Sequence, residues 1–366
     1  MNKTLRLGII GCGRVAFHHA KMLEGAEGIK FAASCDLIEE KAKKHAETVG
    51  SNAYTNYHQM LDKENLDLVV VATPTGAHYT HVKDILNYRP VNILLEKPMV
   101  LRIVHGLELE ALAAQKSVRI FPVYQNRFNT AVQRVKSALV NGELGDVVLA
   151  TVRVRWCRPQ RYYDLAPWRG TFSMDGGAHV NQGIHYVDIL RYLAGEIAEV
   201  NSLFAQLGAK LEAEDTGVSI VKFKNGAVGQ IEITMAARPD DFEASVSVVG
   251  SKGLAVLGGI CCNKLETFSP VPADQLKYSE EVPIAYGLSH RKVYQMIVPA
   301  LLEGKPAPVA FEDGLNTIRL LHALYRSNEE RRWVRLDEQA ESKRLGEDNE
   351  KLLAQYLLQA DQGVKG

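Results

Sequence analysis

The sequence predicts an α/β protein of two domains, a doubly wound parallel sheet followed by an α/β domain with a large, mostly antiparallel, open-faced sheet. The chain has 366 residues, more than one hydrophobic core usually serves. Short apolar strands alternate with helical segments in the first third, and alternating strands with hairpin turns follow from about residue 146. We therefore predict a nucleotide-binding domain over 1–124, a substrate-binding and oligomerisation domain over 125–336, and a charged tail or helix over 337–366.

The first strand, residues 5–10, leads into a glycine-rich turn. Gly11, Gly13 and Ala16 form the pattern GxGxxA before a helix that runs to Leu23. Glycines let the backbone approach a pyrophosphate, whose charge then lies at the helix N-terminus. This motif in this context predicts a Rossmann dinucleotide site contacted by Gly11, Gly13, Arg14 and Val15.

Asp36 follows the second strand, residues 29–35, at about the separation expected of the acid that binds the ribose hydroxyls. A carboxylate accepts hydrogen bonds from the ribose diol and repels a 2′-phosphate, so the sequence predicts NAD as the cofactor. The alternative is that Asp36 caps the helix expected from Glu39.

Two further strand ends are candidate ligand positions. Residues 66–72 contain an unbroken Leu-Val-Val-Val core, typical of a parallel strand buried on both faces. Ligands lie beyond the carboxyl ends of such strands, so Thr73, Pro74 and His78 are predicted to contact the ribose and nicotinamide. His78 as a surface helix residue is the alternative. The strand 91–95 ends in Glu96-Lys97-Pro98, where proline keeps Lys97 extended and leaves both isomers of the Lys97–Pro98 bond open.

The second half of the chain has a different pattern. A helix is expected over 129–141, and two more over 289–303 and 313–327. Strands are expected at 146–155, 200–207, 216–223, 227–235, 244–249, 254–257 and 333–336. Asn225-Gly226 is a strong hairpin turn, which favours antiparallel pairing.

The run from Met174 to Asp188 places polar groups in an apolar helix. Asn181 and His185 are four residues apart, so they share one helix face, away from the stripe of Val180, Ile184 and Val187. A single buried histidine is more often a core residue than a catalytic one. Alcohol oxidation with NAD needs a proton acceptor, however, and Lys97 and His185 are two candidates. A lysine needs a lowered pKa for this role.

Composition excludes several classes of function. Lysine plus arginine total 43 and aspartate plus glutamate total 43, so no net field favours nucleic acid or an anionic membrane. Five cysteines show no metal-binding spacing, and their odd number suits a reducing compartment. Neither a signal peptide nor a membrane-spanning run is apparent. We expect a cytoplasmic protein without a metal.

Taken together, GxGxxA, Asp36, Glu96-Lys97-Pro98 and the helix with His185 resemble the Gfo/Idh/MocA family of sugar and inositol oxidoreductases over roughly residues 5–336. The resemblance implies that Glu96 and Lys97 lie beside the cofactor. It also implies that Lys97, Asn181 and His185 line the substrate pocket, where the family has an Asp-x-x-x-His pair. Asn181 replaces that aspartate. An amide cannot take a proton, so proton transfer falls on Lys97 or His185.

The segments Tyr162-Tyr163, Trp168-Arg169-Gly170-Thr171 and 181–185 resemble one subgroup of that family, which oxidises C3 of UDP-N-acetylglucosaminuronic acid in bacterial surface-polysaccharide (lipopolysaccharide O-antigen) synthesis. Five arginines and four aromatic residues between 153 and 169 can bind carboxylate and phosphate groups. A subunit interface is the alternative reading of these residues. The predicted substrate-binding residues are Lys97, Asn126, Arg127, Arg161, Tyr163, Trp168, Arg169, Asn181 and His185. For Arg127 an ion pair between the domains is the alternative.

The resemblance implies an NAD-dependent dehydrogenase acting on a CH–OH group of this nucleotide sugar, with NADH recycled by 2-oxoglutarate, and a homo-oligomer, either dimer or tetramer. Two alternatives stay open. One is a dehydrogenase of a free sugar, inositol or polyol, for which the arginine-rich segment would be structural. The other is a nicotinamide-binding sensor without catalysis, against which the joint presence of Lys97 and His185 argues.

Overall fold

The computed structural model describes residues 3–358, which form two compact units. The first unit contains the chain up to Val123, then Val293–Gly314, and the described residues from Asp348. The second contains Tyr124–Lys292 and Leu315–Glu347. The sequence had assigned all of 125–336 to one domain, whereas Val293–Gly314 belongs to the first unit, and the chain adds the last strand of the second sheet, at 334–335, only after that segment.

The first unit is built on a parallel sheet with the strand order β3-β2-β1-β4-β5-β6. Its strands are β1 (Leu5–Ile10), β2 (Ile29–Cys35), β3 (Asn52–Tyr54), β4 (Leu68–Val71), β5 (Asn92–Leu95) and β6 (Ile120–Pro122). All four residues of β4 are fully buried, as its unbroken apolar run predicts. The strand order reverses between β1 and β4, and that point is where doubly wound sheets bind nucleotides.

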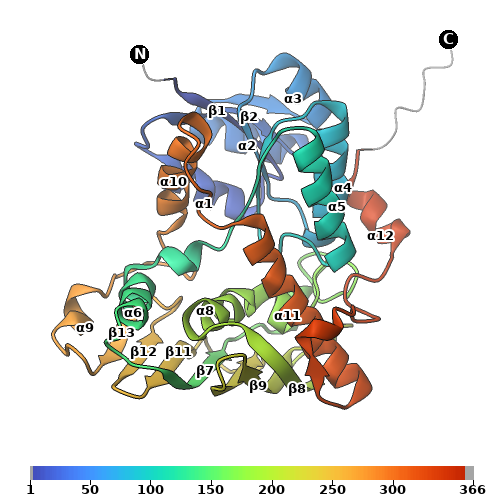
Figure 1. The fold of residues 1–366 in the computed structure, drawn as a ribbon. Helices are drawn as coiled ribbons and strands as arrows, with labels where there is room; N and C mark the ends of the chain where they lie inside the picture. The colour runs from blue at the N-terminus through green and yellow to red at the C-terminus, as the bar shows by residue number, and fades with distance from the viewer. Residues whose placement is uncertain (1–2, 359–366) are drawn as a thin grey trace, which may run out of the picture. The chain divides into compact units, whose positions relative to one another are not determined.

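In the described part of the chain, five helices connect these parallel strands: α1 (Arg14–Leu23), α2 (Glu39–Val49), α3 (Tyr57–Lys63), α4 (Thr75–Tyr88) and α5 (Ile103–Gln115). From later in the chain, α12 (Glu350–Leu353) and most of α10 (His290–Leu302) also belong to the first unit. In Figure 1, α4 and α5 lie side by side, and they pack against one another. The sequence reading missed α3, whose start is marked by Asn56, an N-cap that accepts hydrogen bonds from two backbone amides.

The second unit contains, within residues 3–358, an eight-stranded sheet of order β13-β12-β11-β7-β10-β9-β8-β14. The strands are β7 (Val147–Arg155), β8 (Ile197–Ala205), β9 (Thr216–Phe223), β10 (Val228–Thr234), β11 (Glu243–Gly250), β12 (Leu254–Gly258), β13 (Lys264–Phe268) and β14 (Val334–Arg335). β7 and β10 pair in parallel and the other pairs are antiparallel, which confirms the predicted, mostly antiparallel sheet.

One face of this sheet is packed and the other is open. Burial alternates residue by residue along β9, as expected when one face meets a core and the other solvent. The packed face meets α8 (Ile184–Ala194), which contacts β7 and β11 and lies along the sheet in Figure 1. On the open face Ile220 is 55% exposed and Val228 is 50% exposed.

The remaining elements of the second unit are η1 (Gln125–Phe128), α6 (Thr130–Val140), α7 (Gln160–Tyr163), η2 (Ala178–Gln182), α9 (Asp274–Lys277), most of α11 (Phe311–Glu330) and η3 (Leu336–Glu338). The predicted tail, 337–366, contains η3, α12 and η4 (Ala354–Tyr356) up to residue 358. Its last residues, 359–366, lie outside the described part of the chain.

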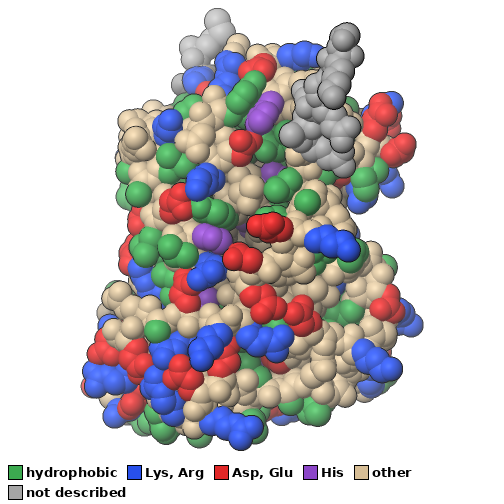
Figure 2. Space-filling model, turned by 90° about the vertical axis from the view of Figure 1, so that its right-hand side faces the viewer, with side chains coloured by type: hydrophobic (Ala, Val, Ile, Leu, Met, Phe, Trp, Pro, Cys, Tyr) green, Lys and Arg blue, Asp and Glu red, His purple; other side chains and the backbone are tan. Residues whose placement is uncertain are grey.

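Surface charge agrees with the balanced composition. On the face shown in Figure 2, lysine and arginine side chains are interspersed with aspartate and glutamate and do not gather in a patch of one sign. Among residues 3–358, no helix combines the length and the apolar character needed to cross a bilayer.

Candidate active site

The glycine-rich turn after β1 has the backbone that its sequence predicts. Gly11 has φ +93°, and a Cβ atom there would lie 2.7 Å from the Ala72 carbonyl oxygen. A larger residue is therefore excluded at this position. A Cβ on Gly13, the N-cap of α1, would meet no atom within 4 Å, so the helix N-terminus opens onto free space. Gly13 and Arg14 are exposed and Val15 is half-buried. This cradle fits the pyrophosphate of a dinucleotide.

Asp36 is tied to that turn. Its Oδ2 accepts a hydrogen bond from the Cys12 backbone amide at 2.8 Å, and its Oδ1 accepts one from the Ile38 amide at 2.9 Å. The N-cap of α2 is Ile38, so Asp36 does not occupy the capping position that was the alternative. A half-buried carboxylate fixed beside the glycine turn fits the ribose diol of NAD.

His78 links the two strand ends predicted to face the nicotinamide. One ring nitrogen lies 2.8 Å from the Thr73 carbonyl oxygen and the other lies 2.9 Å from the Pro98 carbonyl oxygen. The side chain is 1% exposed, which excludes a surface position, and this burial lowers the pKa of the imidazole. His78 therefore ties the loop after β4 to the Lys97–Pro98 segment, whose peptide bond is cis. Its contact with the cofactor stays a prediction, as do those of Thr73 and Pro74.

Glu96 belongs to a buried chain of polar groups that the sequence did not reveal. Its Oε1 lies 3.0 Å from His19 Nε2, and His19 Nδ1 lies 2.7 Å from the Tyr294 hydroxyl. Its Oε2 accepts the Lys97 backbone amide at 3.1 Å. These hydrogen bonds fix the backbone of Lys97, whose side chain is half-buried. Because His19 and Tyr294 are 275 positions apart, spacing along the chain gives no signal for their contact.

In the second unit, His185 lies in the first turn of α8. It is 8% exposed, and its Nε2 lies 3.4 Å from the Gln125 amide nitrogen. The predicted apolar stripe is present, since Val180, Ile184 and Val187 are buried. The regular helix begins only at Ile184, however, and Asn181 lies in the π-helical turn η2 that precedes it. Such turns are frequent at functional sites.

Asn181 has a buried carboxylate beside it. Its amide nitrogen donates a hydrogen bond to Asp175 Oδ1, and the Gly170 backbone amide donates one to Asp175 Oδ2 at 2.6 Å. Asp175 is 1% exposed. Asp175 lies within the run from Met174 to Asp188, but the sequence alone gives it no role, because an acid six positions from Asn181 is not on a predictable helix face.

A second buried carboxylate, that of Glu214, also contacts the turn η2. Glu214 Oε1 accepts the His179 backbone amide at 3.0 Å and lies 3.1 Å from His179 Nδ1. Its Oε2 accepts the Tyr325 hydroxyl at 2.6 Å, and a Cβ on Gly177 would collide with the carboxylate. The backbone and a side chain of η2 are therefore fixed by residues from α11 and from the segment that leads into β9.

The five arginines between 153 and 169 divide into two sets. Arg153, Arg155 and Arg158 all have carboxylate partners: Arg153 lies 3.4 Å from Glu243, Arg155 lies 2.7 Å from Glu232, and Arg158 lies 2.8 Å from Asp241. These three guanidinium groups are neutralised by the domain itself. Arg161 and Arg169 have no carboxylate partner among the described residues.

Arg169 is held by aromatic rings instead of by an acid. Its guanidinium carbon lies 4.5 Å from the ring centroids of both Tyr162 and Trp168, and its Nη1 donates to the Tyr162 hydroxyl at 2.7 Å. Gln182 of η2 also donates to that hydroxyl, at 3.2 Å. The stack therefore connects the arginine-rich loop to the turn with Asn181. Tyr163 is buried at the end of α7, and Arg161 is exposed.

Arg127 and Asn126 differ sharply in their partners. Arg127 donates two hydrogen bonds of 2.6 Å to the two oxygens of Asp188, and both side chains are buried. The predicted ion pair therefore exists, but it lies inside the second unit and does not join two domains. Asn126 is 1% exposed, and neither polar atom of its amide has a hydrogen-bond partner within residues 3–358. Such buried groups are usually satisfied, so Asn126 is suited to receive a ligand.

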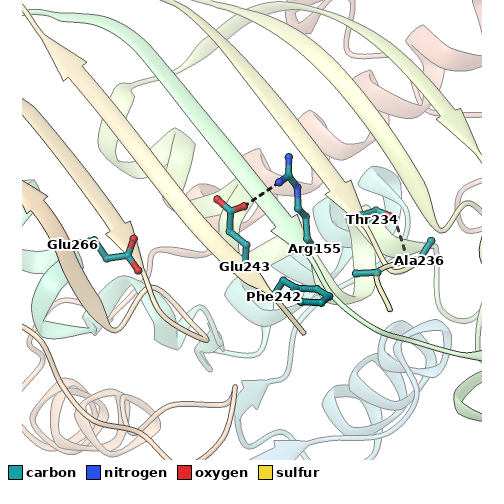
Figure 3. A pocket seen from close by; sticks show the side chains of 7 residues that line it. Arg155, Thr234, Ala236, Phe242, Glu243 and Glu266 are labelled. Atoms are coloured by element: carbon teal, nitrogen blue, oxygen red, sulfur yellow. Dashed lines mark hydrogen bonds and ion pairs between the residues drawn. The ribbon is translucent and has the colours of Figure 1, made fainter. Parts of the chain in front are cut away.

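Two hollows open on the second unit. One, of about 670 Å³, is lined by Arg155, Thr234, Ala236, Ala237, Phe242, Glu243 and Glu266 and contains none of the predicted catalytic residues. Figure 3 shows Arg155 and Glu243 pointing toward one another there from neighbouring strands. The other, of about 840 Å³, is lined by Gln160 and residues 206–211. Gln160 precedes Arg161 in α7, so this hollow adjoins the arginine-rich loop.

The glycine cradle, Asp36 and the switch point of the parallel sheet together define an NAD-binding oxidoreductase domain, and two family models agree. A model described as "Oxidoreductase family, NAD-binding Rossmann fold" matches residues 5–124, and one described as "Oxidoreductase family, C-terminal alpha/beta domain" matches residues 136–336. The chain belongs to the Gfo/Idh/MocA oxidoreductase family, and NAD is its cofactor.

Solved structures and curated relatives resemble the whole chain. The WlbA dehydrogenase of Bordetella pertussis, solved with NADH and UDP-GlcNAcA, is 32% identical with a TM-score of 0.86, covering 92% of this chain and 98% of its own. The WlbA dehydrogenase of Chromobacterium violaceum, solved with the same ligands, is 32% identical with a TM-score of 0.83, covering 92% and 96%. Myo-inositol 2-dehydrogenase of Thermotoga maritima is 26% identical, covering 91% of this chain and 99% of its own. The chain is accordingly an NAD-dependent dehydrogenase of alcohol groups.

Proposed function

We propose that this enzyme oxidises the C3 hydroxyl of UDP-N-acetylglucosaminuronic acid to the 3-keto sugar. The observation that carries the proposal is the similarity to two dehydrogenases solved with NADH and this nucleotide sugar, at 32% identity over 92% of the chain. The motifs YY, WRGT and NQGIH at 162–185 support the same substrate.

The division of the arginines also supports an anionic substrate. A uronic acid joined to a diphosphate carries charges that forked hydrogen bonds from arginine recognise. Arg161 and Arg169 have no carboxylate partner among the described residues, while their three neighbours in the sequence have one. We assign them, with Tyr163, Trp168 and Asn126, to substrate binding.

For the chemistry, NAD, when bound, accepts the hydride from the carbon that carries the hydroxyl. Lys97 or His185 takes the hydroxyl proton, and Asn181 orients the hydroxyl. A neutral amide cannot remove a proton, so one of the two bases must do so. In this proposal Arg127 acts indirectly, since its guanidinium is bound to Asp188.

The test uses purified protein with UDP-N-acetylglucosaminuronic acid, with and without 2-oxoglutarate. We expect a product lighter by two hydrogen atoms, with turnover sustained by the acceptor because it reoxidises NADH. Absence of the 3-keto product under both conditions would contradict the proposal.

A second candidate is the oxidation of a free inositol or sugar, favoured by the 26% identity to myo-inositol 2-dehydrogenase. The same assay with myo-inositol separates the two. NADH formation with the polyol and none with the nucleotide sugar would replace the first proposal with the second.

The wider setting is part of the proposal. We place the reaction in the cytoplasm, in surface-polysaccharide (lipopolysaccharide O-antigen) synthesis, with the open face of the second sheet joining subunits in a dimer or tetramer. The five free cysteines suit a reducing compartment, and the exposed apolar residues Leu203, Ile220 and Val228 suit a contact between subunits. Light scattering of the purified protein measures the assembly.

A further inference from the structure

We propose that Asp175 is a positioning residue for the reaction, because its carboxylate fixes the amide of Asn181 with the amide oxygen directed toward the substrate, where it accepts a hydrogen bond from a donor of the sugar other than the reacting hydroxyl. The inference rests on the proposed function and deepens it. It also accounts for an asparagine at 181, where the family has an aspartate.

The two side chains are held as a pair. The Asn181 amide nitrogen donates to Asp175 Oδ1, and the backbone amide of Gly170 donates to Asp175 Oδ2 at 2.6 Å. Both backbones are fixed as well, since the Asp175 amide donates to the Thr171 carbonyl at 3.1 Å and the Asn181 amide donates to the Gly177 carbonyl at 2.9 Å. Asp175 is 1% exposed, so water does not compete for its oxygens.

The chemistry of the pair determines which way the amide faces. An ionised carboxylate only accepts hydrogen bonds, whereas an amide has a donor end and an acceptor end. The nitrogen of Asn181 must therefore face Asp175, and Oδ1 points the other way. An oxygen fixed in this manner accepts a hydrogen bond from a neighbouring donor group of the sugar. The single proton of the reacting hydroxyl is then left for the base.

An aspartate at position 181 would be incompatible with Asp175. Two carboxylates within hydrogen-bonding distance do not both ionise, so one pKa would rise strongly. In this chain the negative charge therefore lies on Asp175, one hydrogen bond behind position 181. The surrounding charged and titratable groups include Arg169, Tyr162, Tyr163, Glu214 and Tyr325. Burial, and to a smaller extent the charge of Asp175, raises the pKa of Tyr163 and of Tyr325.

A reciprocal exchange tests the pairing. Asp175→Asn keeps an oxygen that can accept the Gly170 amide but removes the charge that orients Asn181. We expect kcat to fall about tenfold with KM nearly unchanged, the loss of one charge-assisted hydrogen bond. Asn181→Asp should also lower kcat and add an ionisation to the pH profile. The double variant, Asp175→Asn with Asn181→Asp, should recover most of kcat, because the amide introduced at position 175 can then donate to the carboxylate introduced at position 181.

A matched control is Asp164→Asn, which should retain wild-type kcat. Asp164 is exposed, and its carboxylate accepts a hydrogen bond from Gln160. Thermal unfolding of each variant separates misfolding from mispositioning. A wild-type kcat in Asp175→Asn, or a double variant no better than the worse single one, would overturn the inference.

A measurement without substrate keeps the inference separate from the proposed function. In Asn181→Asp labelled with ¹³C at the aspartate carboxyl groups, we expect two coupled titrations, one at a pKa well above the ordinary value. Two ordinary titrations would contradict the pairing. If the wild-type enzyme oxidises no UDP-sugar yet the coupled titration is found, the substrate proposal fails and the Asp175–Asn181 pair stands.

Discussion

The two units of this enzyme hold their candidate site residues in different ways. In the first unit, consecutive backbone groups of one short turn form the cradle, and Asp36 is joined to it through the Cys12 amide. In the second, side chains hold one another, as Asp175 holds Asn181 six positions away and Asp188 holds Arg127 at a separation of 61 positions. A backbone site tolerates side-chain change better than a site made of mutually dependent side chains. Four sets of substitutions test this difference.

The largest effect is expected at the buried ion pair of the second unit. Arg127→Ala leaves the Asp188 carboxylate buried without the guanidinium that donates two hydrogen bonds to it. Removing one member of such a pair lowers the free energy of unfolding by about 3–5 kcal/mol. Urea unfolding measures this loss. The control is Arg153→Ala, whose side chain is 48% exposed and pairs with Glu243 at 3.4 Å, where about 1 kcal/mol or less is expected. Equal losses in both variants would remove the distinction between buried and surface pairs.

Lys97→Ala and His185→Asn test the catalytic assignment across the two units. Each should lower turnover by about a hundredfold or more, as for loss of a general acid or base, and leave NAD binding nearly intact. Stopped-flow NADH formation and fluorescence titration with NADH measure the two quantities. Lys43→Ala, on the exposed surface of α2, serves as the control. A variant of either candidate with normal turnover removes that residue from the mechanism.

Arg169 and Arg158 both lie over aromatic rings, but only Arg158 also has a carboxylate partner among the described residues. Arg169→Ala should raise KM for the nucleotide sugar about tenfold or more, since one charged hydrogen bond contributes about 1.5–3 kcal/mol. Arg158→Ala should leave KM unchanged, because its guanidinium is bound to Asp241 at 2.8 Å. Similar KM values for the two variants would assign Arg169 to structure and favour the free-sugar alternative.

The smallest effect is expected at Asp36, where the backbone cradle persists without the side chain. Asp36→Ala should weaken NAD by about tenfold and relax discrimination against NADP, because the diol loses its acceptor and the 2′-phosphate loses a repelling charge. Calorimetric titration with both cofactors checks this. An unchanged preference would mean that Asp36 serves only to hold the Cys12 and Ile38 amides.

Local features of the sequence anticipated most of the fold. The run of apolar residues in β4, the GxGxxA turn and the Asn225-Gly226 hairpin each depend on neighbours along the chain, and each is present. The elements that the sequence did not predict, such as α3 and β13, are short. Their hydrophobic patterns cover too few residues to show a helical or strand period. The site divides in the same way, since Gly11 and Asp36 belong to one local pattern, while the partners of Glu96 and Asn181 do not.

The sequence by itself determined the family, the cofactor and the residues to suspect, because a dinucleotide motif and an EKP motif are local and chemically specific. Only the tertiary structure decided which charges are already neutralised. Arg127 and Arg169 look alike in the sequence, yet one is bound to a buried carboxylate and the other rests on two aromatic rings. The physical reason is that an ion pair depends on a partner's position in space, and Asp188 is 61 residues from Arg127. The same reason hid Asp175, whose effect depends on the turn that brings it to Asn181.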